Sequence, residues 1–393
     1  MKILHIGEYV VGGVATYVNE LVSYQRDRFE VHVLMSDYNS AKDFDLEPEH
    51  IIRYSYKRHP KHFFSAMRQI HQAIRRIEPD IIHVHSSFAG MLARGLFFFT
   101  PRKASIFYCS HGWSFLMDTK PLHKKVYFMI EKILEFKTDY IVNISKYEMQ
   151  ESIRMGMSPA KSRFVYSGLR DRKSHKPQNH AEQLQTIVQK HEEHENQTNM
   201  IRLLFVGRYD RQKGLDLLLD AFRQYPELQQ HIQLYIIGDS VLEKNEWNFT
   251  DNMIRLGWVN HAEIDHYYEQ CDAIIMPSRW EGLPLVALEA MKNHKPVIAS
   301  NRSSLPELVT HGVNGYIFEL EQLEGLREIL MQLDRDTLAA MGETGHQLYR
   351  EKFSSDRMNE EFVSLYYEAR NVEVSFPTAP PASRLEISKR NGD

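Results

Sequence analysis

The chain has 393 residues, of which 42% are apolar and 25% charged, and its formal net charge is −4. This length predicts two or three domains, most simply two, and the composition excludes a disordered chain, a collagen-like fibre and a disulfide-dense scaffold. The slightly acidic balance also argues against a dedicated nucleic-acid binder. Cys109 and Cys271 lie far apart in apolar stretches, which predicts two buried, reduced thiols.

The amino-terminal segment has the pattern of a strand followed by a turn. Glu8 interrupts its apolar run and no small-residue cleavage site follows, so it does not resemble a signal peptide. No apolar run approaches the ~18 residues that a membrane-spanning helix needs. We therefore expect a cytoplasmic protein.

Short β-branched runs alternate with segments of helical period along the whole chain, which predicts an α/β fold with parallel sheets covered on both faces. In the first half the expected strands are Ile3–Ile6, Val31–Met35, Ile81–Val84, Ser105–Tyr108, Tyr140–Asn143 and Phe164–Tyr166. The helices expected between them are Val14–Tyr24, Phe63–Ile77 and Val126–Phe136. The second half is expected to hold strands Leu203–Val206, Leu234–Ile237, Ala273–Met276 and Pro296–Ala299, and helices Leu215–Phe222, Ile264–Tyr268 and Leu285–Lys292.

A change of composition separates the two halves. Residues 168–200 are dominated by charged and amide side chains, which predicts a linker with one short amphipathic helix around Ala181–His191. Residues 371–393 contain Pro and Ser without periodicity and are expected to form a loose tail. The predicted architecture is two doubly wound, Rossmann-like domains, residues 1–167 and 201–353, with a crevice at the carboxyl ends of their strands.

Positive charge gathers in one part of the first half. Residues 51–137 hold 15 basic and 5 acidic side chains, which is typical either of a surface for anionic lipid or polyanionic substrate, or of a solvated face. The basic candidates for a membrane contact are Arg53, Lys57, Arg58, Lys61, Arg68, Arg75 and Arg76. An apolar stripe at helical spacing in the same region is expected to face the core, and it consists of Phe63, Phe64, Met67, Ile70, Ile74 and Ile77.

Two glycine-containing turns lie between a strand and a helix. Gly12 and Gly13 follow the first strand, where glycines let backbone N–H groups approach an anion at a helix amino terminus, although the spacing is not a dinucleotide fingerprint. In the second turn, Arg208 ends a strand and Lys213 opens the next helix. Two cations beside a helix amino terminus suit a diphosphate, whereas an ordinary loop with exposed charges is the alternative.

A third stretch, residues 277–290, carries two carboxylates eight residues apart. Glu281 falls in the loop after the strand Ala273–Met276, and Glu289 falls in the following helix. An acidic side chain that points from a helix into a crevice can hold two vicinal hydroxyl groups, such as those of a ribose. The loop between the carboxylates presents backbone N–H groups and consists of Gly282, Leu283, Pro284 and Leu285.

These motifs, taken in order, resemble glycosyltransferase family 4, a group of retaining nucleotide-sugar enzymes with the GT-B fold. The resemblance rests on the E-x7-E pattern, the GR-x4-KG element and the amino-terminal glycine loop, with the family-like stretches IIHVHS, SHGW, LGWVN and SSLPELVTHGVNGYIF. It covers roughly residues 1–370, weakly in the linker. It also implies that Ser354–Arg370 forms a helix that crosses back to the first domain.

The resemblance implies a role for each matching residue. Arg208 and Lys213 would bind the donor diphosphate, which the Gly12–Gly13 loop approaches from the other domain. Glu289 would bind the ribose. The remaining matches are Glu281, which would lie beside the donor sugar, and His111 of SHGW, which would lie near the reacting centre.

The implied reaction is hexosyl transfer from a nucleotide sugar, with a UDP-sugar favoured, to a glycan or lipid-linked acceptor of a cell-surface polysaccharide (capsule, exopolysaccharide or O-antigen) or a glycolipid. Negative charge grows on the leaving diphosphate, where cations and backbone dipoles stabilise it, so we expect no cofactor and no metal ion. In family 4 the first domain often rests on a membrane, which implies peripheral contact with the inner face of an anionic membrane through residues 51–137. A GT-B sugar-nucleotide epimerase and a non-catalytic sugar-nucleotide-binding protein are the alternatives.

His83 and His85 alternate along one strand, which would suit a metal site. No cysteine or carboxylate with metal-site spacing lies near them in the sequence. We therefore expect structural histidines at these positions.

Overall fold

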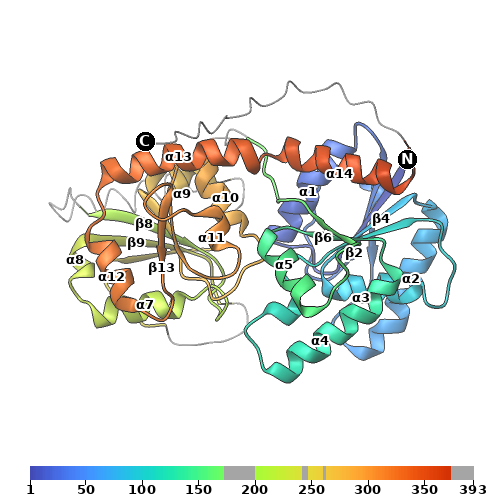
Figure 1. Ribbon diagram of the computed structural model, residues 1–393, viewed down its shortest axis with the longest axis horizontal. Coiled ribbons are helices and arrows are strands. Elements are labelled where there is room, and N and C mark those ends of the chain that lie inside the picture. The colour runs from blue at the N-terminus through green and yellow to red at the C-terminus, as the bar shows by residue number, and fades with distance from the viewer. Residues whose placement is uncertain (172–199, 241–246, 260–262, 373–393) are drawn as a thin grey trace, which may run out of the picture.

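The computed structural model describes residues 1–171, 200–240, 247–259 and 263–372. Two parallel sheets form the frame, one in each half of the chain (Figure 1). The first sheet has seven strands in the order β3-β2-β1-β4-β5-β6-β7. Its strands are β1 (Lys2–Ile6), β2 (Glu30–Ser36), β3 (Ile51–Tyr54), β4 (Ile81–His85), β5 (Ser105–Cys109), β6 (Tyr140–Asn143) and β7 (Ser162–Phe164).

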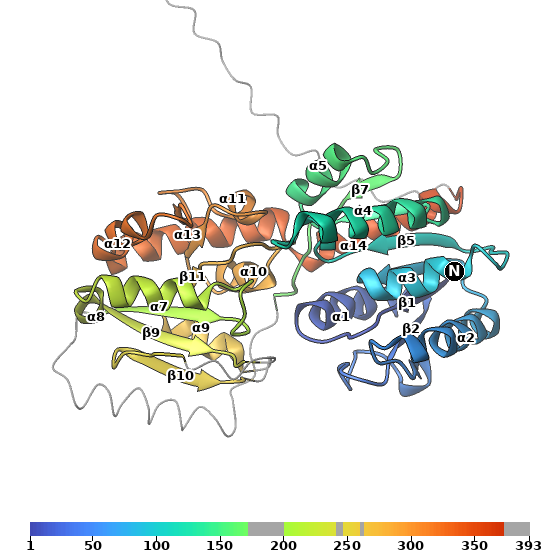
Figure 2. The same ribbon diagram turned by 90° about the horizontal axis from the view of Figure 1, so that it is seen from below.

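Helices cover both faces of this sheet because its strands are apolar on both sides. The helices and 3₁₀ turns of this half are α1 (Gly13–Gln25), η1 (Pro48–His50), α2 (Pro60–Ile77), α3 (Ser87–Leu96), η2 (Ser114–Leu116), α4 (Pro121–Leu134), η3 (Glu135–Lys137) and α5 (Lys146–Met155). α3 packs against both α2 and α4. These three helices lie on one face of the first sheet, on the side toward the viewer in Figure 2.

The second sheet has six strands in the order β10-β9-β8-β11-β12-β13. Its strands are β8 (Ile201–Val206), β9 (Ile232–Ile237), β10 (Met253–Gly257), β11 (Ala273–Met276), β12 (Val297–Ser300) and β13 (Gly315–Phe318). Its helices are α7 (Leu215–Gln224), α8 (Leu228–His231), α9 (Ile264–Gln270), α10 (Leu285–Lys292), α11 (Leu305–Leu308), α12 (Leu323–Met331) and α13 (Arg335–Lys352).

The last helix, α14 (Ser355–Ala369), returns to the first half, as the sequence resemblance implied. In Figure 1, α13 and α14 run end to end across both halves. α14 packs on α1, where the buried Asn359 amide donates to the Glu20 carbonyl at 3.2 Å. At the junction, a Cβ on Gly168 would lie 2.3 Å from the Ser354 carbonyl oxygen, so only glycine allows the segment after β7 to pass this close to the start of α14.

The α/β class and the central strands agree with the sequence analysis, whereas the helices α3, α5, α12 and α13 were not predicted. Among the strands, the disagreements fall at the sheet edges. The edge strands β3, β10 and β13 were not predicted, and β7 lies two residues before the expected Phe164–Tyr166. Edge strands are short and only partly buried, so their apolar pattern is weak. Cys109 and Cys271 are buried free thiols, as expected.

The expected linker helix at Ala181–His191 and residues 373–393 of the expected tail lie outside the described residues. Among the helices that the structure describes, none combines the length and the apolar character needed to cross a membrane.

Candidate active site

A cleft of about 860 Å³ opens between the carboxyl ends of the two sheets. The first half contributes the start of α1 and the loop after β5, and the second half contributes the loops that precede α7 and α10. All of the site residues predicted from the sequence line this one cleft: Gly12, Gly13, His111, Arg208, Lys213, Glu281, Gly282, Leu283, Pro284, Leu285 and Glu289.

α1 begins at the cleft without a side-chain cap. Gly12 occupies the N-cap position with φ 57°, and no acidic side chain lies in the first turn. The free N–H groups of such a helix end attract anions. A Cβ on Gly13 would lie 3.7 Å from a methyl carbon of Leu285, so the opposite wall approaches this turn closely.

α10 reaches the same cleft from the second half. Its N-cap residue, Pro284, makes no side-chain capping bond, and its first turn also lacks acidic residues. Two uncapped helix amino termini therefore converge on one space, and both contribute positive potential.

The loop between β8 and α7 depends on glycine for its shape. Gly214 is the N-cap residue of α7 with φ 72°, and a Cβ there would lie 1.9 Å from the Pro277 carbonyl oxygen. Because any side chain would collide with this carbonyl, glycine lets the loop pack against the end of β11. That packing places Lys213 Nζ 2.7 Å from Glu281 Oε1, and both side chains are largely buried.

Arg208 is more open than Lys213. Its side chain is 49% exposed and forms an ion pair with Asp210 at 3.0 Å and a hydrogen bond with Gln212 Oε1 at 3.2 Å. Gln212 in turn donates to the Trp280 carbonyl at 3.1 Å, which ties this loop to the one that carries Glu281. An anion in the cleft can therefore recruit the Arg208 guanidinium from a solvated position.

Glu289 lies on α10 and borders the cleft with 6% of its surface exposed. The buried Tyr268 hydroxyl donates to Glu289 Oε2 at 2.8 Å, which orients the carboxylate. A carboxylate held in this way can accept two hydroxyl groups of a ligand.

His111 comes from the loop after β5 and faces the second half. Its backbone is left-handed with φ 56°, and a Cβ on Gly282 would lie 3.2 Å from its carbonyl oxygen. Its Nε2 lies 3.0 Å from His85 Nδ1. Burial lowers the pKa of the His111 imidazole to about 3, so the ring is neutral near pH 7.

Several residues that line the cleft were not predicted from the sequence, and Glu148 is the most informative of them. It lies in the first turn of α5, where Ser145 caps the helix by accepting from the Glu148 backbone N–H at 3.1 Å. Its carboxylate accepts from the Trp113 backbone N–H at 3.1 Å, and burial raises its pKa to about 7. The S-x-x-E capping pattern could have predicted this helix start but not its place in the cleft. Other missed lining residues are Tyr147, Gln212, Trp258 and Trp280.

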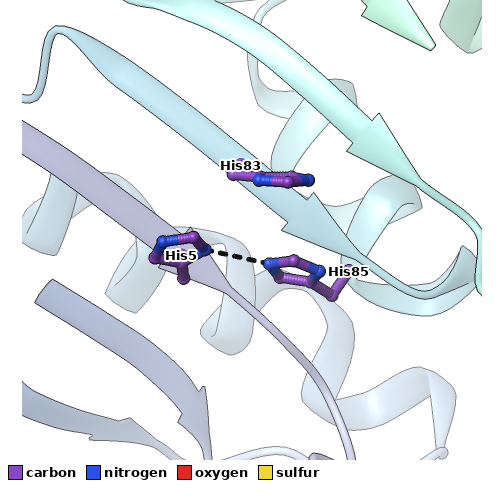
Figure 3. A group of neighbouring side chains, drawn as sticks. All are labelled: His5, His83 and His85. Carbon is purple, nitrogen blue, oxygen red and sulfur yellow. Dashed lines mark hydrogen bonds between the residues drawn. The ribbon is translucent and has the colours of Figure 1, made fainter. Parts of the chain in front are cut away.

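Strand pairing adds a third histidine to the two noted in the sequence. His5 on β1 stands in register with His83 on β4, and His85 lies on the same face (Figure 3). All three are fully buried, and one nitrogen of each lies within 4.8 Å of the others. This cluster was not predicted, because only cysteines and carboxylates near His83 and His85 in the sequence had been considered as partners.

Comparison with known proteins matches both halves of the chain. A family model described as "Glycosyltransferase Family 4" matches residues 11–172, and one described as "Glycosyl transferases group 1" matches residues 187–348. A protein from the cps region of Klebsiella pneumoniae is 34% identical over 93% of this chain and 99% of its own length.

Two further relatives carry more specific descriptions. The capsular polysaccharide biosynthesis glycosyltransferase CapM of Staphylococcus aureus is 23% identical over 87% of this chain and 90% of its own length. The structure of Anabaena HepE in complex with UDP superposes with a TM-score of 0.74 at 19% identity, over 94% of this chain and 100% of that one. The paired sheets, the shared cleft and these matches show that the chain belongs to glycosyltransferase family 4 and is a retaining, nucleotide-sugar-dependent enzyme of the GT-B fold.

Proposed function

We propose that this enzyme transfers a hexosyl group from a UDP-sugar to a glycan or lipid-linked acceptor in the synthesis of a capsule-type polysaccharide or a glycolipid. One observation carries the proposal: Arg208, Lys213 and the uncapped amino ends of α1 and α10 converge on a single cleft. That combination of cations and backbone donors suits a diphosphate.

In this proposal the diphosphate lies between Arg208 and Lys213, with the Gly12–Gly13 turn on its other side. Negative charge develops on the diphosphate as the bond to the anomeric carbon breaks, and preformed cations and helix dipoles stabilise it there. The ribose hydroxyl groups bind Glu289, whose carboxylate Tyr268 already orients.

The donor sugar lies beside Glu281 and the loop of residues 282–285. Because Glu281 forms an ion pair with Lys213 at 2.7 Å, the two side chains hold one another in place before the donor arrives. His111 faces this loop across the cleft and is neutral, so it interacts with hydroxyl groups as a hydrogen-bonding partner and not as a cation.

The departing phosphate oxygen accepts the acceptor proton on the same face of the sugar, so the reaction needs no dedicated protein base. The side chains of Arg208 and Lys213 take the place of a divalent metal ion. We therefore expect transfer to continue in EDTA, which a radiolabel or UDP-release assay with and without the chelator checks.

The relatives favour the donor and the pathway. HepE has been crystallised with UDP, and CapM acts in capsular polysaccharide biosynthesis. The Klebsiella relative is encoded in a cps region. An epimerase or a non-catalytic binding protein would require a departure from the chemistry of the family to which the chain belongs.

Calorimetric titration with UDP, GDP and ADP, without added metal, tests the donor site. We expect binding of UDP in preference to the other two, and loss of that binding in Lys213→Met. Lys352→Met is the matched control, because Lys352 ends α13 on the exposed surface and does not line the cleft. Equal affinity for all three nucleotides, or UDP binding that survives in Lys213→Met, would contradict the assignment.

We also propose that the first half contacts an anionic membrane through α4 and the loop before β5. Phe99 is 86% exposed, and Lys137 Nζ lies 5.0 Å above the Phe98 ring, which joins this loop to η3, directly after α4. Lys124 and Lys125 supply positive charge on α4. The exposed apolar residues of this surface are Phe98, Phe99, Leu122, Val126, Met129, Ile130, Ile133 and Phe136. Interleaved apolar and basic side chains are typical of helices that lie in a lipid interface.

The residues proposed here for the membrane contact differ from those expected from the sequence. Arg58, one of the basic candidates from the sequence, forms a two-pronged ion pair with the buried Glu8 at 2.8 and 2.9 Å and is not free for lipid. In the apolar stripe on α2, Ile70 and Ile77 are buried as expected, but Phe64 is 81% exposed, which corrects its assignment to the core.

Flotation with vesicles containing phosphatidylglycerol, at low and high salt, tests the membrane contact. We expect salt-sensitive binding that Ile133→Glu reduces. Val313→Glu in the second half is the matched control, since the two side chains are 51% and 50% exposed. Binding that is indifferent to salt, or equally weakened by both substitutions, would argue against this surface.

A further inference from the structure

A row of hydrogen-bonded histidines runs from the core of the first half to the cleft. His5 Nε2 lies 2.8 Å from Gln25 Oε1, and His5 Nδ1 lies 3.0 Å from His85 Nε2 (Figure 3). His85 Nδ1 then lies 3.0 Å from His111 Nε2. Gln25, His5 and His85 are fully buried, whereas His111 borders the cleft.

The inner end of the row sets the direction of every bond in it. An amide oxygen only accepts, so His5 must donate from Nε2 to Gln25. A neutral imidazole has one donor and one acceptor, so His5 Nδ1 accepts from His85 Nε2. By the same reasoning, His85 Nδ1 accepts from Nε2–H of His111.

The surroundings keep the histidine rings neutral. Burial lowers the pKa of His5 to about 4 and lowers the pKa of His85 well below its usual value. The Gln25 amide oxygen faces His5, and the amide nitrogen has no hydrogen-bond partner within the described residues. The Tyr366 hydroxyl on α14 bonds to Nδ1 of the third histidine, His83, at 2.7 Å.

The same rings are poorly arranged as metal ligands. The ring of His83 stacks on that of His85, with centroids 4.3 Å apart and planes 30° apart. Imidazole lone pairs lie in the ring plane, so stacked rings do not direct them to one point. The facing nitrogens of His5 and His85 already share a hydrogen bond. A hydrogen-bonded row therefore explains the geometry better than a metal centre does.

We propose that Gln25, His5 and His85 are positioning residues that hold His111 as the neutral Nε2–H tautomer and leave its Nδ1 as a hydrogen-bond acceptor for a hydroxyl group in the cleft. The row ends at an amide, which does not relay protons. The row therefore orients His111 and does not conduct protons to it. Within the described residues, no hydrogen bond occupies His111 Nδ1. This inference deepens the proposed function, because it assigns the polarity of one contact to a sugar or acceptor hydroxyl.

Nitrogen-15 NMR of the full chain, labelled at histidine, reads the tautomers directly and needs no substrate. We expect Nε2–H signals for His5, His85 and His111 in the wild type, with His111→Gln identifying the His111 signals. In Gln25→Met the acceptor is lost while the side-chain volume is kept, so the row can reverse and His111 gains the Nδ1–H form. Gln25→Glu restores an acceptor oxygen, so His111 should retain the Nε2–H form in this variant.

Each outcome is decisive. An Nδ1–H form of His111 in the wild type, or an unchanged His111 tautomer in folded Gln25→Met, would overturn the proposal. A stoichiometric zinc ion in the purified protein, with metal-shifted signals from His5 and His85, would also overturn it. Because the wild-type measurement requires neither UDP nor an acceptor, failure here is distinguishable from failure of the proposed transfer activity.

Discussion

The wall of the cleft from the second sheet carries charged side chains, whereas the wall from the first sheet carries backbone N–H groups and a neutral imidazole. The charged side chains are Arg208, Lys213, Glu281 and Glu289, which come from the connections before α7 and α10 and from α10 itself. The opposite wall presents the start of α1 and His111. The difference suggests a division of labour, in which one wall holds the donor and the other leaves a low-charge surface for the acceptor.

The two walls also differ in how their residues are held. Lys213 and Glu281 hold each other through a direct ion pair. His111 depends on a row of rings that reaches into the core and ends at Gln25. Substitutions on the charged wall should therefore change the affinity for UDP directly. Substitutions on the neutral wall should act through the orientation and protonation of His111.

The largest expected effect is that of Lys213→Met, which would break the charged wall. Loss of a charge-assisted contact to the diphosphate should weaken UDP binding roughly 10- to 100-fold and abolish transfer. Calorimetry and a UDP-release assay measure the two effects. A variant that binds UDP normally would show that the diphosphate lies elsewhere.

Glu148→Gln tests whether the opposite wall is truly uncharged. Burial raises the pKa of Glu148 from 4.5 to about 7, so its contribution to stability is full below about pH 4.5 and is lost as pH rises through about 7. The wild type should thus lose up to about 3 kcal/mol of unfolding free energy over that interval from this group. Glutamine stays neutral, so the variant should lack this loss and be the more stable protein at pH 8.

Urea unfolding at pH 5, 6, 7 and 8 measures this difference. Glu360→Gln, on the exposed side of α14, is the matched control and should leave the pH profile unchanged. Parallel profiles for the wild type and Glu148→Gln would mean that Glu148 is ionised in the folded protein throughout this range.

Glu289→Gln sharpens the assignment of the ribose contact. Loss of a charged acceptor in a nearly buried position should weaken UDP binding by about 1–3 kcal/mol. Tyr268→Phe removes only the hydroxyl that orients Glu289, and we expect a smaller loss of about 1 kcal/mol. Calorimetry with UDP compares the two, and a greater loss in Tyr268→Phe would reverse their proposed roles.

Gly282→Ala should have the smallest effect, because it acts only where the two walls meet. The added methyl group would lie 3.2 Å from the His111 carbonyl, so the walls must separate by a few tenths of an ångström. We expect UDP affinity to fall less than tenfold, which is below about 1.4 kcal/mol. A complete loss of binding would indicate that the closed contact between the walls is essential.

The charged wall could be predicted from the sequence, whereas the neutral wall could be predicted only in part. The residues from Arg208 to Lys213 and from Glu281 to Glu289 are close in the chain, and each follows an apolar strand directly. In parallel α/β sheets the strand-to-helix connections lie at the carboxyl edge, so the order of strand and helix along the chain is enough to place them. Gly12, Gly13 and His111 were placed partly by family resemblance.

Local sequence alone determined the α/β class, the central strands, the glycine turns and the charged side chains of the cleft. Tertiary structure decided that His5 joins His83 and His85, because β1 pairs with β4, a strand far from it in the sequence. It also decided the burial of Glu148 and the exposure of α4. These features depend on which strands pair and which helix faces are covered, and such long-range packing leaves no periodic pattern in the chain.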